Sequence, residues 1–262
     1  MTESDRTALA EELRARIRRA GTISFRDFFD SALYHPSLGY YTRAGAGTGR
    51  SGDFSTSPDV SPAFGQRLAL QAADVHERLG GGPWRLVELG PGRGLLAGDL
   101  LDGLARHAPD ARRALEEIVL VEVSPTLRDE QARRLRRRER LPALRWLESL
   151  GELASEGVRG LVVANEVLDA LPVHAVVRRE AGLRELHVDV DPSGEGFRFV
   201  EGELSRAEVG EVVERYRLCP ETGHRAEVCL AMPALLADLA RGLEAGAALF
   251  VDYGHDAARL GG

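Results

Sequence analysis

Apolar positions along the chain follow two patterns, and each pattern predicts one kind of element. In residues 5–20, Leu9, Leu13 and Ile17 recur at steps of four, which is typical of one buried face of a helix. The same spacing recurs farther along, in one case directly after the capping residue Ser24. It predicts further helices over residues 25–34, 62–79, 95–101, 125–140, 205–217 and 233–243.

Short continuous apolar runs alternate with these helices and predict buried strands. Their β-branched and aliphatic residues suit strands that are covered on both faces, as in a parallel sheet. A chain that alternates such strands with helices is expected to form an α/β fold with a doubly wound, Rossmann-like sheet. The five predicted core strands are residues 86–89, 117–122, 143–147, 160–164 and 247–252.

Between residues 173 and 200 apolar and polar positions alternate, and turn residues separate the runs at 180–182 and 191–194. This pattern is typical of antiparallel strands, so we expect an inserted β meander. Most of the phenylalanine and tyrosine residues lie earlier, between Phe25 and Phe64. They predict either the core of a small N-terminal subdomain or an aromatic cap over a bound ligand, and the two readings are compatible.

One stretch combines a strand, a glycine turn and the start of a helix, and it runs from Leu86 to Gly94 as LVELGPGRG. Its alternate glycines allow a sharp turn and a close approach to a ligand. A dinucleotide fingerprint needs a glycine where this chain has Leu95, so an NAD site is disfavoured. The run E-x-G-x-G-x-G instead resembles motif I of class I S-adenosylmethionine (SAM) methyltransferases. This resemblance implies cofactor contacts from Glu88, Gly90, Pro91, Gly92 and Gly94, and the alternative is a glycine turn that binds no ligand.

Two further acidic residues stand at predicted strand ends. Glu122 ends the second strand, where doubly wound folds carry a carboxylate that binds the ribose hydroxyls. Glu148 follows the third strand, where enzymes of this class often contact the adenine ring. Both are candidate cofactor contacts, and the alternative for Glu122 is a surface charge at the end of a strand.

Composition and charge exclude several functions. The formal net charge of −7 disfavours a dedicated nucleic-acid binder, because affinity for phosphate backbones comes mainly from clustered basic residues. The arginine-rich run 133–145 is expected to be a solvated helix face. The chain contains no lysine, which excludes a Walker P-loop and a lysine Schiff base. Cys219 and Cys229 have no metal-ligand or disulfide spacing, so we expect packing roles for them and no metal site.

The chain has no apolar run of transmembrane length, and its first residues lack a signal-peptide pattern. We therefore expect a cytoplasmic protein without membrane insertion. The sequence does not predict an oligomeric state.

Six segments carry a more specific resemblance. They are residues 39–41 (GYY), 52–58 (GDFSTSP), 88–94 (ELGPGRG), 122–124 (EVS), 165–173 (NEVLDALPV) and 252–254 (DYG). Together they resemble the MidA family of SAM-dependent methyltransferases, over about residues 20–255. The second and fifth segments are far more specific than the glycine motif. The resemblance implies that Gly52 and Asp53 also contact the cofactor.

Animal members of this family are mitochondrial assembly factors of respiratory complex I that dimethylate an arginine of a core subunit. The resemblance therefore implies a protein substrate, such as a respiratory-complex subunit, with an arginine as methyl acceptor. Glu166 and Asp169 become candidate catalytic carboxylates that orient the guanidinium and accept its proton, and Asn165 a candidate that fixes the loop or the substrate. From local pattern alone, Asn165 or Glu166 could instead cap a helix that follows the strand.

Three other functions are alternatives to arginine methylation. A SAM methyltransferase that acts on a small molecule would share the cofactor motifs. A SAM-binding assembly factor that serves mainly as a protein-binding scaffold would share them as well. An adenine-N6 or amide methyltransferase resembles N-P-P-Y/F at the end of the fourth strand, whereas this chain has Asn165-Glu166-Val167-Leu168, which disfavours that class.

The chain departs from the family at two places. Asp59 stands where members more often have Glu. Members also continue well beyond the DYG segment, so we expect a fragment with a C-terminally truncated sheet. The four expected regions are a helical N-terminal cap with the GDF loop (1–82), a SAM-binding core (83–172), an inserted meander and helix (173–230), and the last helix and strand of the core (231–262).

Overall fold

The computed structural model describes residues 3–42 and 56–254, and these form two compact units. The first, which we call the sheet unit, comprises the described residues of 56–169 and 234–252. The second, which we call the meander unit, comprises residues 3–42, 170–233 and 253–254. The predicted cofactor contacts Gly52 and Asp53 lie outside the described residues.

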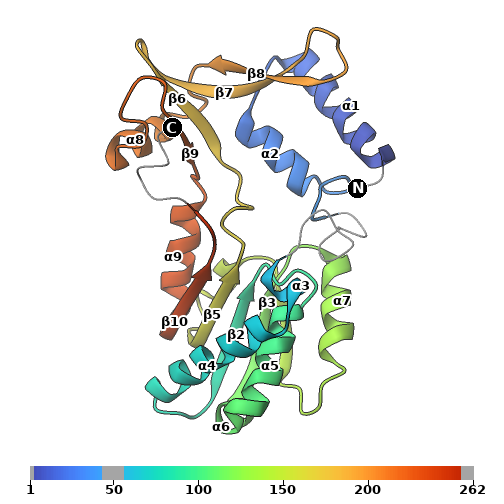
Figure 1. The fold of residues 1–262 in the computed structure, drawn as a ribbon, viewed down its shortest axis with the longest axis vertical. Helices are drawn as coiled ribbons and strands as arrows, with labels where there is room; N and C mark the ends of the chain where they lie inside the picture. Colours follow the sequence, from blue (N-terminus) through green and yellow to red (C-terminus); the bar gives the residue numbers. More distant parts are fainter. Residues whose placement is uncertain (1–2, 43–55, 255–262) are drawn as a thin grey trace. The chain divides into compact units, whose positions relative to one another are not determined.

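The sheet unit is built on five parallel strands in the order β10-β5-β2-β3-β4 (Figure 1). This is a doubly wound order, because the first strand of the unit, β2, lies in the middle and the chain winds outwards from it in both directions. The predicted Rossmann-like α/β class is confirmed. The strands are β2 (Trp84–Leu89), β3 (Leu115–Val121), β4 (Ala143–Leu147), β5 (Val158–Asn165) and β10 (Leu243–Val251).

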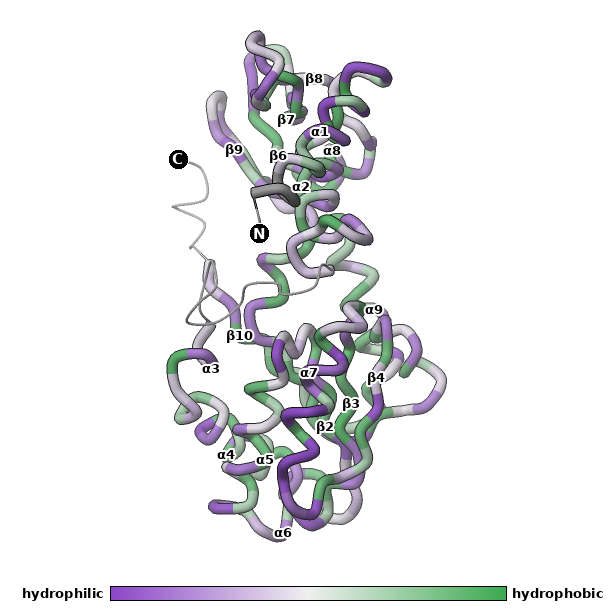
Figure 2. The backbone as a smooth tube through the Cα atoms, turned by 90° about the vertical axis from the view of Figure 1, so that its right-hand side faces the viewer, coloured by the Kyte–Doolittle hydropathy of each residue, from purple (hydrophilic) through white to green (hydrophobic). Residues whose placement is uncertain are grey.

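Helices cover both faces of this sheet. Alternate strand residues point to opposite faces, so Leu86 and Ile118 pack against α4, α5 and α7, whereas Val87 and Val119 pack towards η1 and α9. Figure 2 shows β2 and β3 largely in hydrophobic colours and α7 largely in hydrophilic ones. The helices are α3 (Ser57–Val60), α4 (Ala63–Arg78), α5 (Leu95–His107), α6 (Pro109–Ala114), α7 (Pro125–Leu135), the 3₁₀ turn η1 (Leu150–Leu153) and α9 (Met232–Gly242).

The meander unit contains an antiparallel sheet in the order β1-β7-β6-β9, with β8 paired to β7. The inserted meander is therefore present, and the N-terminal helices pack against it through Leu9, Ile17 and Val188. Phe25 and Phe28 also pack against this core. The elements are α1 (Glu3–Ala20), β1 (Ile23–Ser24), α2 (Phe25–Tyr34), β6 (His174–Arg179), β7 (Gly182–Val190), β8 (Phe197–Gly202), α8 (Ala207–Tyr216) and β9 (Arg225–Val228).

Three details differ from the sequence-based expectation. The helix expected over residues 125–140 ends at Leu135, because Arg138 turns back to pair with Asp102 and the chain must return to β4. The strands β1 and β9 were not predicted. The helix α4, expected within an N-terminal cap region, packs on α5 and lies in the sheet unit.

None of the described helices is both long enough and apolar enough to cross a membrane.

Candidate active site

The carboxyl ends of the parallel strands meet at one edge of the sheet, and the residues that follow them are joined by backbone hydrogen bonds. The amide of Gly90 donates to the Val121 carbonyl at 3.1 Å, and that of Glu122 to the Leu147 carbonyl at 2.9 Å. The amide of Glu166 donates to the Val251 carbonyl at 2.8 Å. Ligands of open α/β sheets bind at this edge, beside the point where the strand order reverses. Here that point lies between β2 and β5.

The glycine turn after β2 adopts a backbone that side chains disfavour. Gly90, Gly92 and Gly94 have φ angles of 58°, 50° and 75°. A Cβ on Gly90 would come within 3.0 Å of the Val167 side chain, and one on Gly94 within 3.2 Å of Gln131. A Cβ on Gly92 would meet no atom of the described residues within 4 Å, so among them this glycine borders open space that a ligand can fill. Pro91 is buried, and its carbonyl accepts the Gly94 amide at 2.8 Å to close the turn.

Glu88 lies on β2, directly before this turn, and only 3% of the residue is exposed. Burial raises the pKa of its carboxyl to about 8, although a hydrogen bond from the Ala97 amide acts in the opposite direction. Its Oε2 atom is buried without a hydrogen-bond partner among the described residues. A buried, unpaired carboxyl oxygen is costly, and a cationic ligand group placed there would stabilise it.

Glu122 follows β3 and is held by two donors. The Ser124 amide donates to Oε1 at 2.8 Å, and Gln131 Nε2 lies 3.3 Å from Oε2. Burial raises the pKa of this carboxyl, and both hydrogen bonds oppose the shift. Each oxygen keeps a lone pair, so both can still accept a hydroxyl proton of a ribose.

Gln131 is a site residue that the sequence analysis missed. Its side chain is fully buried on α7, and its Nε2 also donates to the Gly92 carbonyl at 2.7 Å. Its Oε1 accepts from Trp146 Nε1 at 2.7 Å. One amide therefore connects the glycine turn, the acidic residue Glu122 and β4. The available signal was a polar residue on the apolar stripe of α7, midway between Leu127 and Leu135.

A second tether reaches the glycine turn from α3. Arg93 Nη2 donates to Asp59 Oδ1 at 2.6 Å, and the other oxygen of Asp59 accepts the Thr56 amide at 3.0 Å in a capping box. Burial by itself raises the pKa of Asp59, but the hydrogen bonds from Thr56 and Arg93 outweigh it and the pKa is lowered. Asp59 is thus a carboxylate that fixes α3 against the turn.

The residue pair at the end of β5, Asn165 and Glu166, includes a strained backbone position. Glu166 has a φ of 52°, a left-handed conformation that is uncommon for a residue with a side chain. Its Oε1 accepts from Asn165 Nδ2 at 3.3 Å and from the Ser57 amide at 3.4 Å. The only side-chain oxygen of Asn165, Oδ1, is buried without a partner among the described residues.

The loop that follows is fixed by β10. Asp252 Oδ2 accepts the Leu168 amide at 2.9 Å, and Asp169 is exposed one residue later. In the described chain β5 leads through a turn into β6 without a helix, so the helix-capping alternative for Asn165 and Glu166 is wrong. The signal for Asp252 was its position as the last residue of the fifth predicted strand.

Glu148 lies at the end of β4, on the same sheet edge. Its side chain is 79% exposed, and Arg128 Nη2 lies 3.8 Å from its Oε1. It is thus less constrained than Glu88 or Glu122.

Together these residues form two groups with different chemistry. The glycine turn, Glu88 and Glu122 offer an open cradle and carboxyl groups, which suit a ligand with an ammonium group and a ribose. Asn165 and Glu166 offer an amide and a carboxylate at the neighbouring strand, which suit a planar cation. The arrangement can hold an electrophile and an acceptor side by side.

Comparison with known proteins agrees with this chemistry. Residues 67–262 match the family described as "Putative S-adenosyl-L-methionine-dependent methyltransferase". A relative from Drosophila melanogaster, the mitochondrial protein arginine methyltransferase NDUFAF7 homolog, is 35% identical over 97% of this chain and 62% of its own length. The Homo sapiens protein arginine methyltransferase NDUFAF7 is 31% identical over 97% of this chain and 61% of its own. The chain thus spans about three fifths of the length of these relatives.

A solved structure is similar over nearly the whole chain. A COG1565 superfamily member from Burkholderia thailandensis, crystallised with S-adenosyl-homocysteine, is 35% identical with a TM-score of 0.80. The match covers 96% of this chain and 64% of that one.

Proposed function

Because the chain belongs to a family of S-adenosyl-L-methionine-dependent methyltransferases, we propose that it transfers a methyl group to an arginine of a protein substrate. SAM is the cofactor of this family, and its sulfonium supplies the methyl group. One observation carries the proposal: the cradle at Gly92 and the carboxylate of Glu166 lie on the same edge of one sheet. An open cofactor site and a group that can hold a cationic acceptor are therefore neighbours.

The residues of the first group fit SAM. We assign Glu88 Oε2 to the ammonium end of the cofactor, because this buried oxygen has no partner of its own. The space at Gly92 allows the cofactor to approach the backbone, and Glu122 keeps acceptor positions for the ribose. Glu148, Gly52 and Asp53 remain predicted contacts, together with Gly90, Pro91 and Gly94.

The second group, Asn165 and Glu166, is proposed to bind the arginine that accepts the methyl group. A guanidinium is a weak nucleophile because it is protonated and delocalised near neutral pH. Glu166 Oε2 accepts no hydrogen bond from the described residues, so it can bind a guanidinium nitrogen, orient the group and accept its proton as the new N–C bond forms. Asn165 Oδ1 can accept a further N–H, and Asp169 is a second candidate carboxylate.

The protein substrate is proposed from the names of the relatives, which are protein arginine methyltransferases. A respiratory-complex subunit is the finer proposal and comes from the family resemblance. The cytoplasmic location stays a prediction, and the relatives named above are mitochondrial.

The test is transfer from SAM carrying an isotopically labelled methyl group to a library of arginine-containing peptides, read by mass spectrometry. We expect labelled methylarginine with the unchanged protein and a loss of about a hundredfold or more with Glu166→Gln, whose SAM binding should persist. Glu116→Gln is the matched control, because Glu116 is exposed at the opposite end of β3. Label found only on a small molecule, or SAM binding without transfer to any acceptor, would overturn the arginine assignment.

A further inference from the structure

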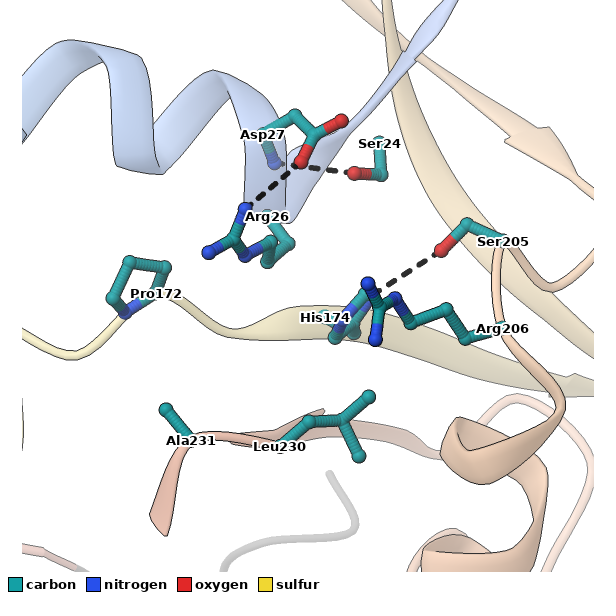
Figure 3. A pocket seen from close by; sticks show the side chains of 9 residues that line it. All are labelled: Ser24, Arg26, Asp27, Pro172, His174, Ser205, Arg206, Leu230 and Ala231. Carbon is teal, nitrogen blue, oxygen red and sulfur yellow. Dashed lines mark hydrogen bonds and ion pairs between the residues drawn. The ribbon is translucent and has the colours of Figure 1, made fainter. Parts of the chain in front are cut away.

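The meander unit contains a pocket of its own, with a volume of about 420 Å³ (Figure 3). It lies where α2 begins, β6 begins and the chain enters α8. A volume of this size is within the range of small-ligand sites, roughly 300–1,000 Å³. The site proposed for methyl transfer uses none of its lining residues, all of which belong to the meander unit.

Basic side chains predominate on the polar side of the pocket. Arg26, Arg206 and His174 line it, and Asp27 is the only acidic residue in the part of the lining that the structure describes. Asp27 is already paired with Arg26 at 3.1 Å and with Arg16 at 3.4 Å. The Arg206 side chain makes no hydrogen bond or ion pair with the described residues, and the residue is exposed at the rim. An anionic ligand would therefore meet an arginine that has no competing partner.

The floor of this side is a buried hydrogen-bonded network. His174, which is 4% exposed, lies with its Nδ1 2.8 Å from Oε1 of the fully buried Glu185. The same carboxyl accepts Ser205 Oγ at 3.0 Å and the Ser205 amide at 2.6 Å. Burial by itself raises the pKa of Glu185, but these bonds outweigh it and the pKa is lowered, so Glu185 is a carboxylate.

This network fixes the orientation of the His174 ring. With Nδ1 hydrogen-bonded to Glu185, the other nitrogen, Nε2, has no partner among the described residues, although the residue lines the pocket. The His174 ring is more than nine-tenths buried, its Nδ1 is fixed by Glu185, and its Nε2 is left without a partner among the described residues. Such a ring is suited to contact a polar ligand atom through Nε2.

Three side chains of the lining are apolar. Leu230 and Ala231 lie across from Arg26 and His174, whereas Pro172 lies beside Arg26 (Figure 3). A ligand that fills the whole pocket thus needs an anionic end and an aliphatic part. We propose that the pocket binds a carboxylate on a short aliphatic stem, with Leu230 beside the stem. The Arg206 guanidinium and the Nε2–H of the imidazolium form of His174 donate to the carboxylate. A glutamate side chain of a bound polypeptide and a free dicarboxylic acid share this chemistry.

The test follows the His174 ring signals by NMR during titration, assigned with a His174→Gln variant. The probes are glutarate as the free acid and N-acetyl-glutamate methylamide as the peptide form. N-acetyl-glutamine methylamide has the same shape without the charge, and inorganic phosphate has the charge without the stem. We expect saturable shifts with at least one carboxylate, and about tenfold weaker effects from the glutamine probe and from phosphate. Which carboxylate binds more tightly identifies the source.

Arg206→Gln should weaken carboxylate binding by about tenfold, whereas Arg215→Gln, which removes the same charge from an exposed position on α8, should not. Equal binding of the glutamine probe, equal binding of phosphate, or no saturable shift with either carboxylate would overturn the proposal. The readout involves no SAM and no methyl transfer. The pocket proposal is therefore tested independently of the proposed methyltransferase activity.

Discussion

At the scale of single residues, Glu88 is the proposed cofactor contact whose pKa is raised furthest, to about 8. Its pKa of about 8 keeps it largely protonated at pH 7 when the site holds no cation. An ammonium group beside Oε2 favours the carboxylate, so we expect SAM binding at pH 7 to release close to one proton. Calorimetric titration in two buffers with different ionisation enthalpies measures this release. Glu88→Gln should remove the buffer dependence and weaken binding about tenfold, with Glu116→Gln as the control.

The same residue gives a pH dependence of stability in the absence of cofactor. Its folded-state pKa of about 8 lies above the ordinary value of 4.5, so between these two pH values the folded protein binds the proton more tightly than the unfolded chain. The free energy of unfolding therefore falls as pH rises through this window. Urea unfolding at pH 5.5 and pH 8 should show a smaller loss for Glu88→Gln than for the unchanged protein. An equal or larger loss in the variant would mean that Glu88 is already ionised at pH 5.5.

Gln131 is expected to matter for both stability and binding, because one buried amide has three partners. Gln131→Leu leaves the Gly92 carbonyl and Trp146 Nε1 without their partner, at a cost of about 1–3 kcal/mol in the free energy of unfolding. Because Glu122 also loses a donor, S-adenosyl-homocysteine should bind about tenfold more weakly in calorimetry. Trp146→Phe removes only one of these bonds and is the comparison. If Gln131→Leu lost stability but bound the cofactor normally, Gln131 would have a purely structural role.

At the scale of elements, α3 depends on one ion pair to hold it against the glycine turn. The lowered pKa of Asp59 means that its contribution is present above the unfolded-state pKa and is lost as pH falls through the folded-state value. Asp59→Asn should therefore reduce the free energy of unfolding at pH 7, by about 1–3 kcal/mol, and have little effect near pH 2. Chemical unfolding at the two pH values measures this, with Asp74→Asn on the exposed face of α4 as the control. A loss of the same size at both pH values would contradict the role of the Asp59 charge.

Several elements followed from the sequence because their signals are local. The five strands of the parallel sheet are continuous apolar runs, and each was predicted within a few residues. By contrast, β1 has two residues and β9 has four, in a run that begins with Arg225, and such segments carry no periodicity of their own. They become strands because Ile23 pairs with Val188 and His174 pairs with Val228.

The same distinction applies to the site. The glycine turn and Glu122 could be predicted, since each stands at a strand end in the sequence. Gln131 and the Arg93–Asp59 pair could not, because their partners are distant along the chain and are brought together by the packing of α7 and α3. The left-handed conformation of Glu166 could not be predicted from the sequence either. It accompanies hydrogen bonds to Val251 and Ser57, which are distant along the chain.

At the scale of the whole molecule, the chain forms two compact units. The sheet unit brings strand ends from distant parts of the sequence to one edge, where the proposed methyl transfer takes place. The meander unit joins the N-terminal helices to the insertion through a shared core, which the sequence presented as separate segments. Each unit carries its own candidate ligand site, so variants in one unit can be tested without altering the lining of the other.

The central claim is that the glycine turn holds SAM, and calorimetric titration with SAM, S-adenosyl-homocysteine and NAD tests it most directly. The two sulfur compounds should bind saturably and NAD should not. Gly92→Val should weaken binding by about a hundredfold or more, because its side chain would fill the space left for the cofactor. Gly80→Val is the matched control, since Gly80 has a φ of 82° and open surroundings away from the site. Unchanged affinity in a folded Gly92→Val protein, or saturable binding of NAD alone, would contradict the account.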